Sequence, residues 1–351
     1  MTAARALSLY GSAHAAVDGA CAALVFGLFA SGHCDPRLFI ALAAAYNLLA
    51  FGLQPLLALA IDGRRDYRHA AAAGCALTAA AMLLPGSLAI LAVCLAGVGN
   101  AIFHLGAGSL ALRIRPGCAT PAGIFVAPGA IGLFLGTVLG QSRFSALWAA
   151  APVLGAFAVL LLRHEAPAFQ RRDDAPAQPI GPGRLMLLLL LSSIAMRSLL
   201  SLALGLPRAP GPALVPLMVL AAALGKAFGG VLADRFGWMR MALWAPLLSM
   251  PLLMFGTASH AEKIAAMFLV SATMPVALAA VAEAFPREPA FAFGLTAAAL
   301  LVGALPALTP APAFLGIGAA MAAAALVCAL ALCGGLRLAR LSYAAQTQYA
   351  K

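Results

Sequence analysis

The most restrictive feature of the sequence is a nearly unbroken series of long apolar runs. They lie at 8–30, 38–61, 69–85, 87–112, 120–140, 145–162, 185–206, 212–233, 241–257, 264–284, 291–308 and 313–336. A helix crosses the hydrocarbon core of a bilayer with roughly 17–25 such residues. Only 9% of the residues are charged, whereas a soluble protein has about a quarter. The sequence predicts an all-α integral membrane protein with about twelve transmembrane helices.

Basic residues gather in alternate loops between these runs. If the N-terminus is cytoplasmic, sixteen Lys and Arg residues lie on the cytoplasmic side, and the other side holds only Arg37, Arg143, Arg208 and Lys263. Because this bias in short loops sets orientation, both termini should be cytoplasmic, in a membrane of the bacterial inner type. The net charge of +11 then reflects topology, so lipid rather than nucleic acid is the expected surrounding.

One long polar interval divides the chain. Residues 163–184, RHEAPAFQRRDDAPAQPIGPGR, are rich in Pro, Gly and charge, which is typical of a solvated linker. The division predicts two pseudo-symmetric six-helix bundles around a central cavity, at 1–162 and 185–351, the second ending in a short cytoplasmic tail. Repeats that rock about a midplane site are typical of transporters.

The loops after the second and eighth runs repeat one another. The first reads GLQPLLALAIDGRRDYR and the second LGKAFGGVLADRFGWMR. Aligning Asp62 with Asp234 also aligns two further polar pairs, Arg68 with Arg240 and Gln54 with Lys226. Polar residues match at fixed offsets less readily by chance than apolar ones, so an internal repeat is predicted.

The second loop has the chemistry of a cytoplasmic clasp. Gly230 and its neighbour allow another helix to approach closely. Asp234 can face the positive N-terminus of a further helix, and Arg235 and Arg240 can bind carboxylates or carbonyls. Glu283, at the inner end of the tenth run, is a candidate partner for either arginine. Such a clasp would close in one conformation and open in another.

The same loop resembles the signature loop of the major facilitator superfamily. The matching residues are Gly230, Asp234, Arg235, Gly237 and Arg240, while Trp238 and Met239 replace commonly basic positions. The first copy is degenerate, because Ala58 replaces the glycine. The resemblance covers the whole chain and implies a secondary transporter that works by alternating access. Residues 99–109, GNAIFHLGAGS, and residues 273–303 also resemble bacterial exporters of the fosmidomycin-resistance type.

Ionisable residues near the middle of apolar runs are functional candidates, since charge is costly there. Asp18 lies in the first run with His14 one turn earlier, and Arg197 lies in the seventh run. The first and seventh runs are equivalent in a two-repeat fold. We therefore expect Asp18 and Arg197 to interact directly or through substrate and to couple transport to protons. A permanent ion pair that only fixes helix packing is the alternative.

A second set of polar residues is expected to line a substrate cavity. It comprises Asn47, Gln54, Asn100, His104 and Lys226. Two cations, Arg197 and Lys226, in the second half would favour an anionic or zwitterionic substrate. The alternatives are that the polar residues serve helix packing and that Lys226 extends along its helix toward Asp234.

Glycine spacing in the fifth run predicts a close helix contact. Gly132, Gly136 and Gly140 recur every fourth residue, and Pro128-Gly129 adds a bend. The run resembles the Gly-Pro motif of superfamily antiporters, which favours export over uptake.

Six histidines and seven cysteines show no ligand spacing, so neither a metal site, another cofactor nor a disulfide framework is expected.

The sequence thus predicts proton-coupled export of a small organic solute, drug-like or anionic, by a monomer. Proton-coupled uptake of a small organic anion or metabolite is the alternative within the class. An integral membrane enzyme is the alternative of another class, but the only acidic cluster, Asp173-Asp174, lies in the linker where nothing fixes its geometry. We therefore do not expect an enzyme.

Overall fold

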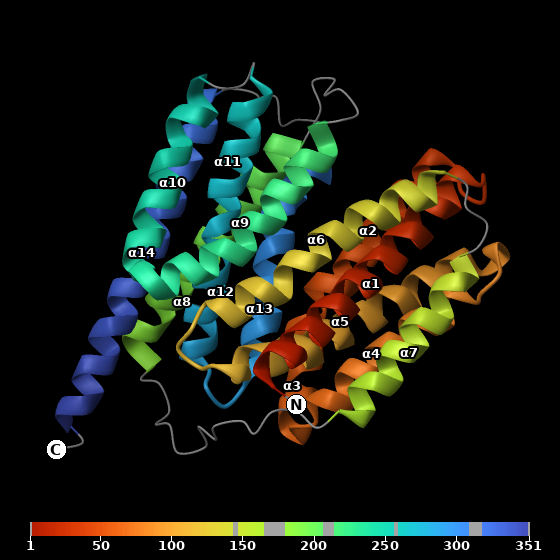
Figure 1. Ribbon diagram of the computed structural model, residues 1–351, viewed down its shortest axis with the longest axis horizontal. Helices are drawn as coiled ribbons and strands as arrows, with labels where there is room; N and C mark the ends of the chain where they lie inside the picture. The colour runs from red at the N-terminus through yellow and green to blue at the C-terminus, as the bar shows by residue number, and fades with distance from the viewer. Residues whose placement is uncertain are drawn as a thin grey trace. The chain divides into compact units, whose positions relative to one another are not determined.

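The computed structural model describes residues 2–142, 147–164, 180–205, 214–255, 259–308 and 318–349. Every regular element within these ranges is helical (Figure 1). Most of the predicted linker lies outside the described residues, as do Arg143, Arg208 and the Asp173-Asp174 pair.

The helices follow the apolar runs. They are α1 (Ala3–Ala30), α2 (Pro36–Asn47), α3 (Gln54–Arg64), α4 (Tyr67–Met82), α5 (Ala89–Ile114), α6 (Thr120–Gln141), α7 (Ala150–Arg163), α8 (Ile180–Gly205), α9 (Leu214–Phe236), α10 (Trp238–Phe255), α11 (His260–Ala272), α12 (Met274–Ala284), α13 (Pro289–Ala304) and α14 (Gly318–Tyr349). A π-helical turn, Leu48–Gly52, joins α2 to α3 into one span, and α11 and α12 form another.

The predicted all-α membrane class is confirmed. Within the described ranges, nine helices are long and apolar enough to cross a membrane, and Leu147–Arg163 and Pro289–Ala304 are shorter apolar helices. Large apolar side chains point outward, among them Leu56, Ile90 and Leu188, each more than 60% exposed. On a soluble protein such side chains would form an aggregation surface, whereas in a bilayer they face lipid.

Contacts divide the chain into two compact units. The first comprises Met1–Arg115, Ile124–Gln170 and Glu288–Ala298, and the second comprises Pro116–Gly123, Arg171–Arg287 and Ala299–Lys351. Helices α6 and α13 therefore each begin in one unit and continue in the other. The boundaries predicted from the linker stay a prediction.

In the first unit, glycines bring α6 against α1 as their spacing predicted. A Cβ on Gly132 or Gly136 would overlap the backbone of Ala15 or Gly19. A Cβ on Gly140 would lie 2.7 Å from the carbonyl oxygen of Ala23. Lipid removes the hydrophobic drive between helices, so such close backbone packing supplies much of the attraction.

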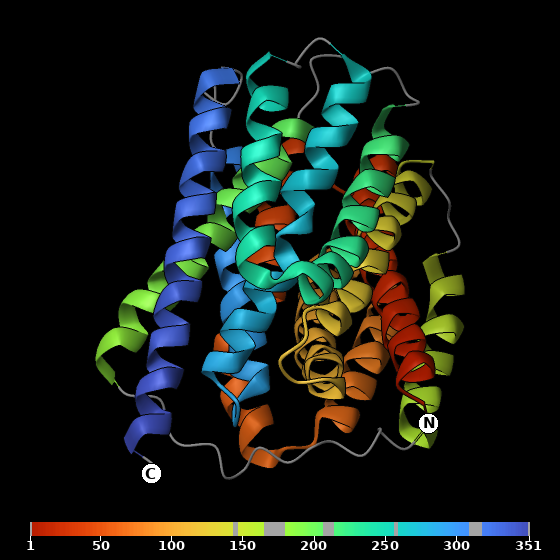
Figure 2. The same cartoon turned by 60° about the vertical axis from the view of Figure 1, so that its left-hand side comes forward.

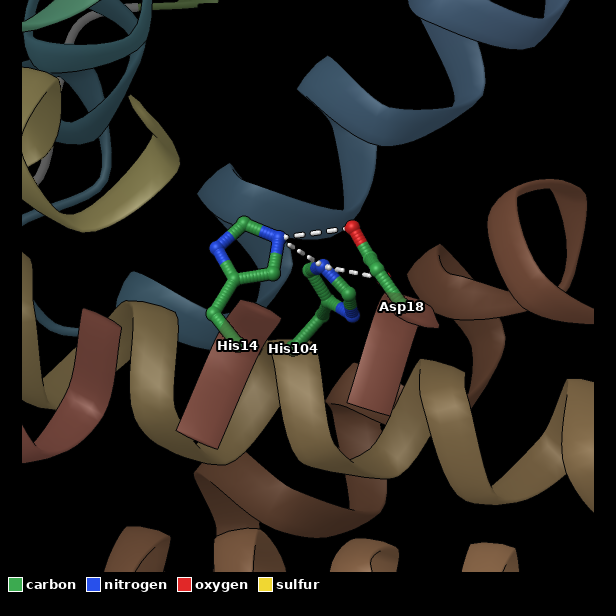
Figure 3. A group of neighbouring side chains, drawn as sticks. All are labelled: His14, Asp18 and His104. Carbon is green, nitrogen blue, oxygen red and sulfur yellow. Dashed lines mark hydrogen bonds and ion pairs between the residues drawn. The ribbon is translucent and has the colours of Figure 1, made fainter. Parts of the chain in front are cut away.

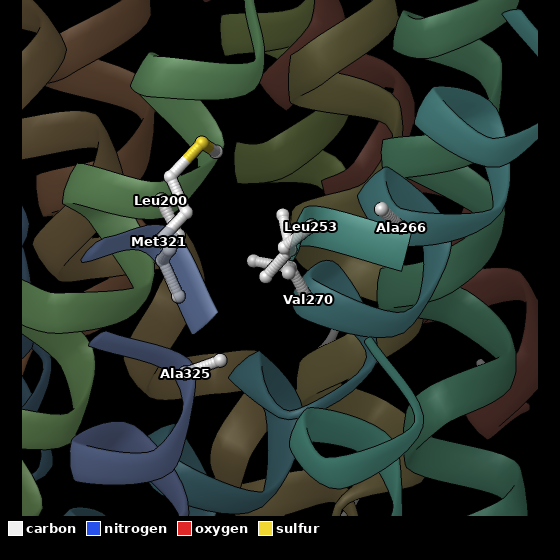
Figure 4. Close-up of a cluster of buried hydrophobic side chains, with 6 residues drawn as sticks. All are labelled: Leu200, Leu253, Ala266, Val270, Met321 and Ala325. Carbon is white, nitrogen blue, oxygen red and sulfur yellow. The ribbon is translucent and has the colours of Figure 1, made fainter. Parts of the chain in front are cut away.

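In the second unit, four helices share an apolar core. Its buried residues come from α8, α10, α11 and α14 (Figure 4) and are Leu200, Leu253, Ala266, Val270, Met321 and Ala325. Figure 2 shows α14 running beside α10, in agreement with their contacts. The side chains are of mixed size, which lets the helices interdigitate.

Asp66 stabilises the first turn of α4, and its loss has a measurable cost. Its carboxylate accepts from the backbone N–H of His69 at 3.4 Å and contacts the His69 Nδ1 at 2.6 Å. We expect Asp66→Ala to lower the free energy of unfolding by about 1 kcal/mol, the usual value of an N-cap. Thermal unfolding in detergent measures the change.

This contribution should depend on pH. The hydrogen bond with His69 is the main cause that lowers the pKa of Asp66. A lowered carboxylate pKa stabilises the fold fully above the ordinary aspartate value of about 3.9, and the stabilisation is lost as the pH falls through the lowered value. A difference between wild type and Asp66→Ala that stays constant into acid would contradict this account.

Candidate functional site

Two helical pairs of polar residues meet inside the first unit. His14 and Asp18 lie one turn apart on α1, and Figure 3 shows His104 of α5 beside them. Asn100 lies one turn before His104 on α5. The Nε2 atom of His14 is 2.8 Å from Nε2 of His104 and 3.1 Å from Oδ2 of Asp18. His104 Nε2 is 3.7 Å from Oδ1 of Asp18. We call these four residues the α1–α5 polar cluster.

Backbone carbonyls fix the proton on one nitrogen of each imidazole. His14 Nδ1 is 2.9 Å from the carbonyl oxygen of Phe125, and His104 Nδ1 is 2.9 Å from that of Asn100. A carbonyl oxygen only accepts, so both Nδ1 atoms must donate. If both rings were neutral, their two Nε2 lone pairs would then face one another at 2.8 Å. A proton on one Nε2 atom would turn this contact into a hydrogen bond.

The remaining contacts orient the carboxylate. Asn100 Nδ2 donates to Oδ1 of Asp18 at 2.9 Å, while the Asn100 Oδ1 atom is buried without a hydrogen-bond partner in the described structure. Both imidazoles are buried, with 5% of each histidine exposed, but 18% of the Asp18 side chain is exposed. The cluster is thus enclosed on the imidazole side and partly exposed at Asp18.

Aromatic rings and one glycine pack around the imidazoles. The His14 ring stacks on Phe125 with centroids 4.8 Å apart, and the His104 ring lies 6.1 Å from the Phe293 ring. A side chain at position 129 would overlap the His14 ring, so Gly129 makes room for it. The apolar walls exclude water and strengthen the electrostatic interactions inside.

The cluster revises one expectation from the sequence. The histidines looked scattered, yet folding brings together one ligand atom each from His14, Asp18 and His104, all within 4.8 Å. Among the described residues this is the one group that could hold a metal ion. Two of its contacts, at 2.8 and 3.1 Å, have hydrogen-bond distances.

In the second unit, Arg197 is buried on α8. Only 4% of the residue is exposed, and its Nε and Nη2 atoms have no hydrogen-bond partner among the described residues. Cys328 of α14 lies close by and donates to the carbonyl oxygen of Ser193 at 3.4 Å. The interaction of Arg197 with Asp18 stays a prediction.

Asp234 at the end of α9 holds the first turn of α6. Its carboxylate accepts from the N–H groups of Ala119 and Thr120, both at 2.8 Å, and from the Thr120 hydroxyl at 2.6 Å. A Cβ on Gly230 would lie 3.0 Å from the Thr120 Cα, so this glycine admits the approach. The helix N-terminus expected beside Asp234 is therefore that of α6.

Asp62 makes the equivalent contact in the first unit. It accepts from the N–H groups of Ala290 at 3.1 Å and Phe291 at 2.8 Å, in the first turn of α13. The internal repeat extends to the backbone, because Arg65 has φ 54° and the aligned Gly237 has φ 104°. Each copy of the loop thus binds the start of one of the two helices that continue into the other unit.

An aromatic donor completes each copy of the loop, and neither residue was predicted from the sequence. Tyr67 donates its hydroxyl to Oδ1 of Asp62 at 2.9 Å, and Trp238 donates its indole N–H to Oδ1 of Asp234 at 3.0 Å. In the sequence, Trp238 is notable only because it stands at a commonly basic position of the loop. Its spacing of four residues from Asp234 on a helical path was the available signal.

The other residues predicted for the cytoplasmic clasp make different contacts from one another. Arg235 lies over the Phe236 ring at 5.5 Å, and Arg240 donates to the Phe236 carbonyl oxygen at 3.4 Å. Glu283 accepts from the N–H of Gly117 at 2.8 Å. Its pairing with either arginine stays a prediction, as does the role of Arg68, which is half-buried.

Three residues predicted to line a substrate cavity, Asn47, Gln54 and Lys226, lie on or beside α2, α3 and α9. Asn47 immediately precedes the π-helical turn and donates to the Ala43 carbonyl oxygen at 2.8 Å. Gln54 follows that turn, is fully buried, and has an Oε1 atom without a hydrogen-bond partner in the described part. Lys226 is half-buried on α9. Their contact with substrate stays a prediction.

Removing the negative charge of Asp62 or Asp234, the carboxylates of the two repeated loops, should destabilise the protein. Asp62→Asn is expected to cost about 2 kcal/mol, since it leaves buried donors poorly paired, and Asp234→Asn about 1 kcal/mol because its site is exposed. Arg235→Gln is the matched control, with a change within about 0.5 kcal/mol. Chemical unfolding in detergent measures all three. Equal stability of wild type and Asp62→Asn would show that the helix contact contributes nothing.

Comparisons with known proteins agree with this architecture. No protein-family model matches the sequence, and no curated protein shows significant similarity to it. The crystal structure of the major facilitator superfamily transporter FucP in the outward conformation matches with a TM-score of 0.62 at 13% identity, over 95% of this chain and 99% of that one. A variant of the E. coli fucose:proton symporter FucP matches with a TM-score of 0.66 at 13% identity, over 97% and 99%. The chain therefore has the fold of major facilitator superfamily transporters.

Proposed function

We propose that the chain is a proton-coupled secondary transporter of a small organic solute, and that it works by alternating access. The fold shared with transporters supports this function. So do the two repeated loops, each of which binds the first turn of a helix that continues into the other unit. Such contacts form in one conformation and break in another when repeats rock about a central site.

The observation that carries proton coupling is the 2.8 Å contact between the Nε2 atoms of His14 and His104. Both Nδ1 atoms face backbone carbonyl oxygens, which supports a proton held between the two Nε2 atoms. Asp18 beside it balances the resulting charge, which makes one bound proton nearly neutral overall. Among described residues of the first unit, Cys21 and Tyr46 are the other titratable groups close to the carboxylate.

Proton release would follow from a change in the surroundings of the α1–α5 polar cluster. If α1 moves relative to α5, the two rings separate and the reason to hold the proton is lost. Arg197, predicted to approach Asp18 in another state, would replace the proton as counter-charge. Proton loading and the conformational step are then linked through the same carboxylate.

Export of a drug-like or anionic solute remains the preferred direction, on the resemblance of the fifth run to antiporters. Proton-coupled uptake is the second candidate, because FucP, of similar fold, is a fucose:proton symporter. We place the protein as a monomer in a cytoplasmic membrane, with both termini cytoplasmic. A membrane enzyme is the less favoured class, since the cluster lies within the helices rather than at the membrane surface.

Reconstituted vesicles test the function. The purified protein is placed in proteoliposomes containing a pH-sensitive dye, and organic anions, drugs and sugars are added on one side with no imposed gradient. Proton movement in the direction of the solute indicates symport, and opposite movement indicates antiport. Solute flux with no proton movement, and no response to an imposed pH gradient, would overturn proton coupling.

A further inference from the structure

In the second unit, one edge of the buried Arg197 guanidinium group makes no hydrogen bond to the described residues. The two nitrogen atoms without a hydrogen-bond partner among the described residues are Nε and Nη2. Their N–H bonds lie on the same edge of the planar group and point in parallel. That edge is the one that binds both oxygens of a carboxylate at once.

A second unpartnered group lies one helical turn away. The Ser201 Oγ atom is also buried without a partner in the described part of the chain. Positions 197 and 201 are four residues apart on α8, so their side chains share one face of that helix. The neighbouring Ser198 differs, because it donates to the Leu300 carbonyl oxygen at 2.8 Å. The free donors are thus confined to one face.

The described carboxylates of the second unit do not compensate this charge. Asp234 and Glu283 bond to the segment that begins α6, and Glu262 lies in the first turn of α11. A buried guanidinium without a counter-charge is strongly destabilising, whereas a bidentate anion offsets that cost.

We propose that Arg197 and Ser201 bind the carboxylate group of the transported solute, with Arg197 Nε and Nη2 holding its two oxygens and the Ser201 hydroxyl donating to one of them. The assignment rests on the proposed transport function and names its substrate class as a small organic carboxylate. The guanidinium edge favours an anion that offers two oxygens side by side over a neutral amide, and a single negative charge matches the single charge of Arg197.

Ligand-induced thermal shifts in nanodiscs test the site without any proton gradient. The probes are lactate and benzoate, the neutral lactamide and benzamide, and phenylphosphonate. We expect at least one carboxylate to raise the melting temperature and its amide to have no effect. Arg197→Gln should abolish the shift, and Arg197→Lys should weaken binding at least about tenfold because an ammonium group lacks the parallel pair of N–H bonds. Ser201→Ala should weaken binding several-fold, and the exposed Arg184→Gln on the same helix should leave it unchanged.

Three results would overturn the assignment. They are equal carboxylate binding by wild type and Arg197→Gln, preference for the amides or the phosphonate, and no shift with any carboxylate at millimolar concentration. Unliganded melting temperatures show whether each variant folds, and Arg197→Lys keeps the charge if Arg197→Gln does not fold. Carboxylate binding without proton-linked flux would refute the proposal of proton-coupled transport and leave the carboxylate site standing. Proton-linked flux restricted to neutral solutes would refute the carboxylate site and leave the transport proposal standing.

Discussion

Replacing Asp18 by Asn is expected to abolish proton-driven accumulation of solute while downhill exchange continues. The variant keeps the shape of the side chain but removes the negative charge 3.1 Å from the His14 Nε2 atom. An imidazolium without a counter-charge is costly within a membrane. On the proposed mechanism, the proton shared by His14 and His104 is then held less tightly, by about tenfold for each 1.4 kcal/mol of lost attraction.

Accumulation in proteoliposomes under an imposed pH gradient measures this effect. Solute exchange without a gradient shows that the variant is folded and still cycles. Asp66→Asn is the matched control, because it changes an exposed aspartate in a loop and should leave accumulation intact. Full proton-driven accumulation by Asp18→Asn would refute the role of the α1–α5 polar cluster.

The second large effect is expected at the contact of α1 with α6. In Gly136→Ala the new Cβ would overlap the Gly19 carbonyl oxygen and come within 2.7 Å of its Cα. Backbone cannot yield as a side chain does, so the helices must separate. We expect a loss of about 1–3 kcal/mol in the free energy of unfolding, and no folded protein for Gly136→Leu.

A second glycine serves as a control, because its replacement by alanine should change the free energy of unfolding in the opposite direction. Gly155 lies within α7, and no atom outside its own helix lies within 4 Å of the position that a Cβ would occupy. Gly155→Ala should therefore gain about 0.5–1 kcal/mol from helix propensity alone. Thermal unfolding in the same detergent compares the two variants. If both alanine substitutions shift stability in the same direction, close α1–α6 packing is not what makes Gly136 necessary.

The fold was predictable because a bilayer leaves few alternatives. Backbone groups within hydrocarbon must be satisfied locally, so each long apolar run becomes a helix. The position of Asp234 beside a helix N-terminus also followed from local chemistry, since a carboxylate at a helix end has few other favourable surroundings. Glycines every fourth residue in α6 likewise marked a close contact before its partner was known.

The candidate site was predictable only in pieces. Spacing of four residues placed His14 beside Asp18 and Asn100 beside His104, but the two pairs had been given separate roles. Only the packing of α1 against α5 brings them to 2.8 Å. Likewise, the sequence marked Arg197 as a cation within an apolar run. That its Nε and Nη2 atoms and the Ser201 hydroxyl lack partners among the described residues follows only from side-chain geometry.

Trp238 gives the repeated loop an optical signal. Its indole N–H bonds to the same carboxylate that holds the start of α6. Indole emission responds to a neighbouring negative charge, and only two other tryptophans, Trp148 and Trp244, occur in the chain. With both replaced by phenylalanine, the fluorescence of the remaining indole would follow the opening and closing of one clasp during turnover, with no added label.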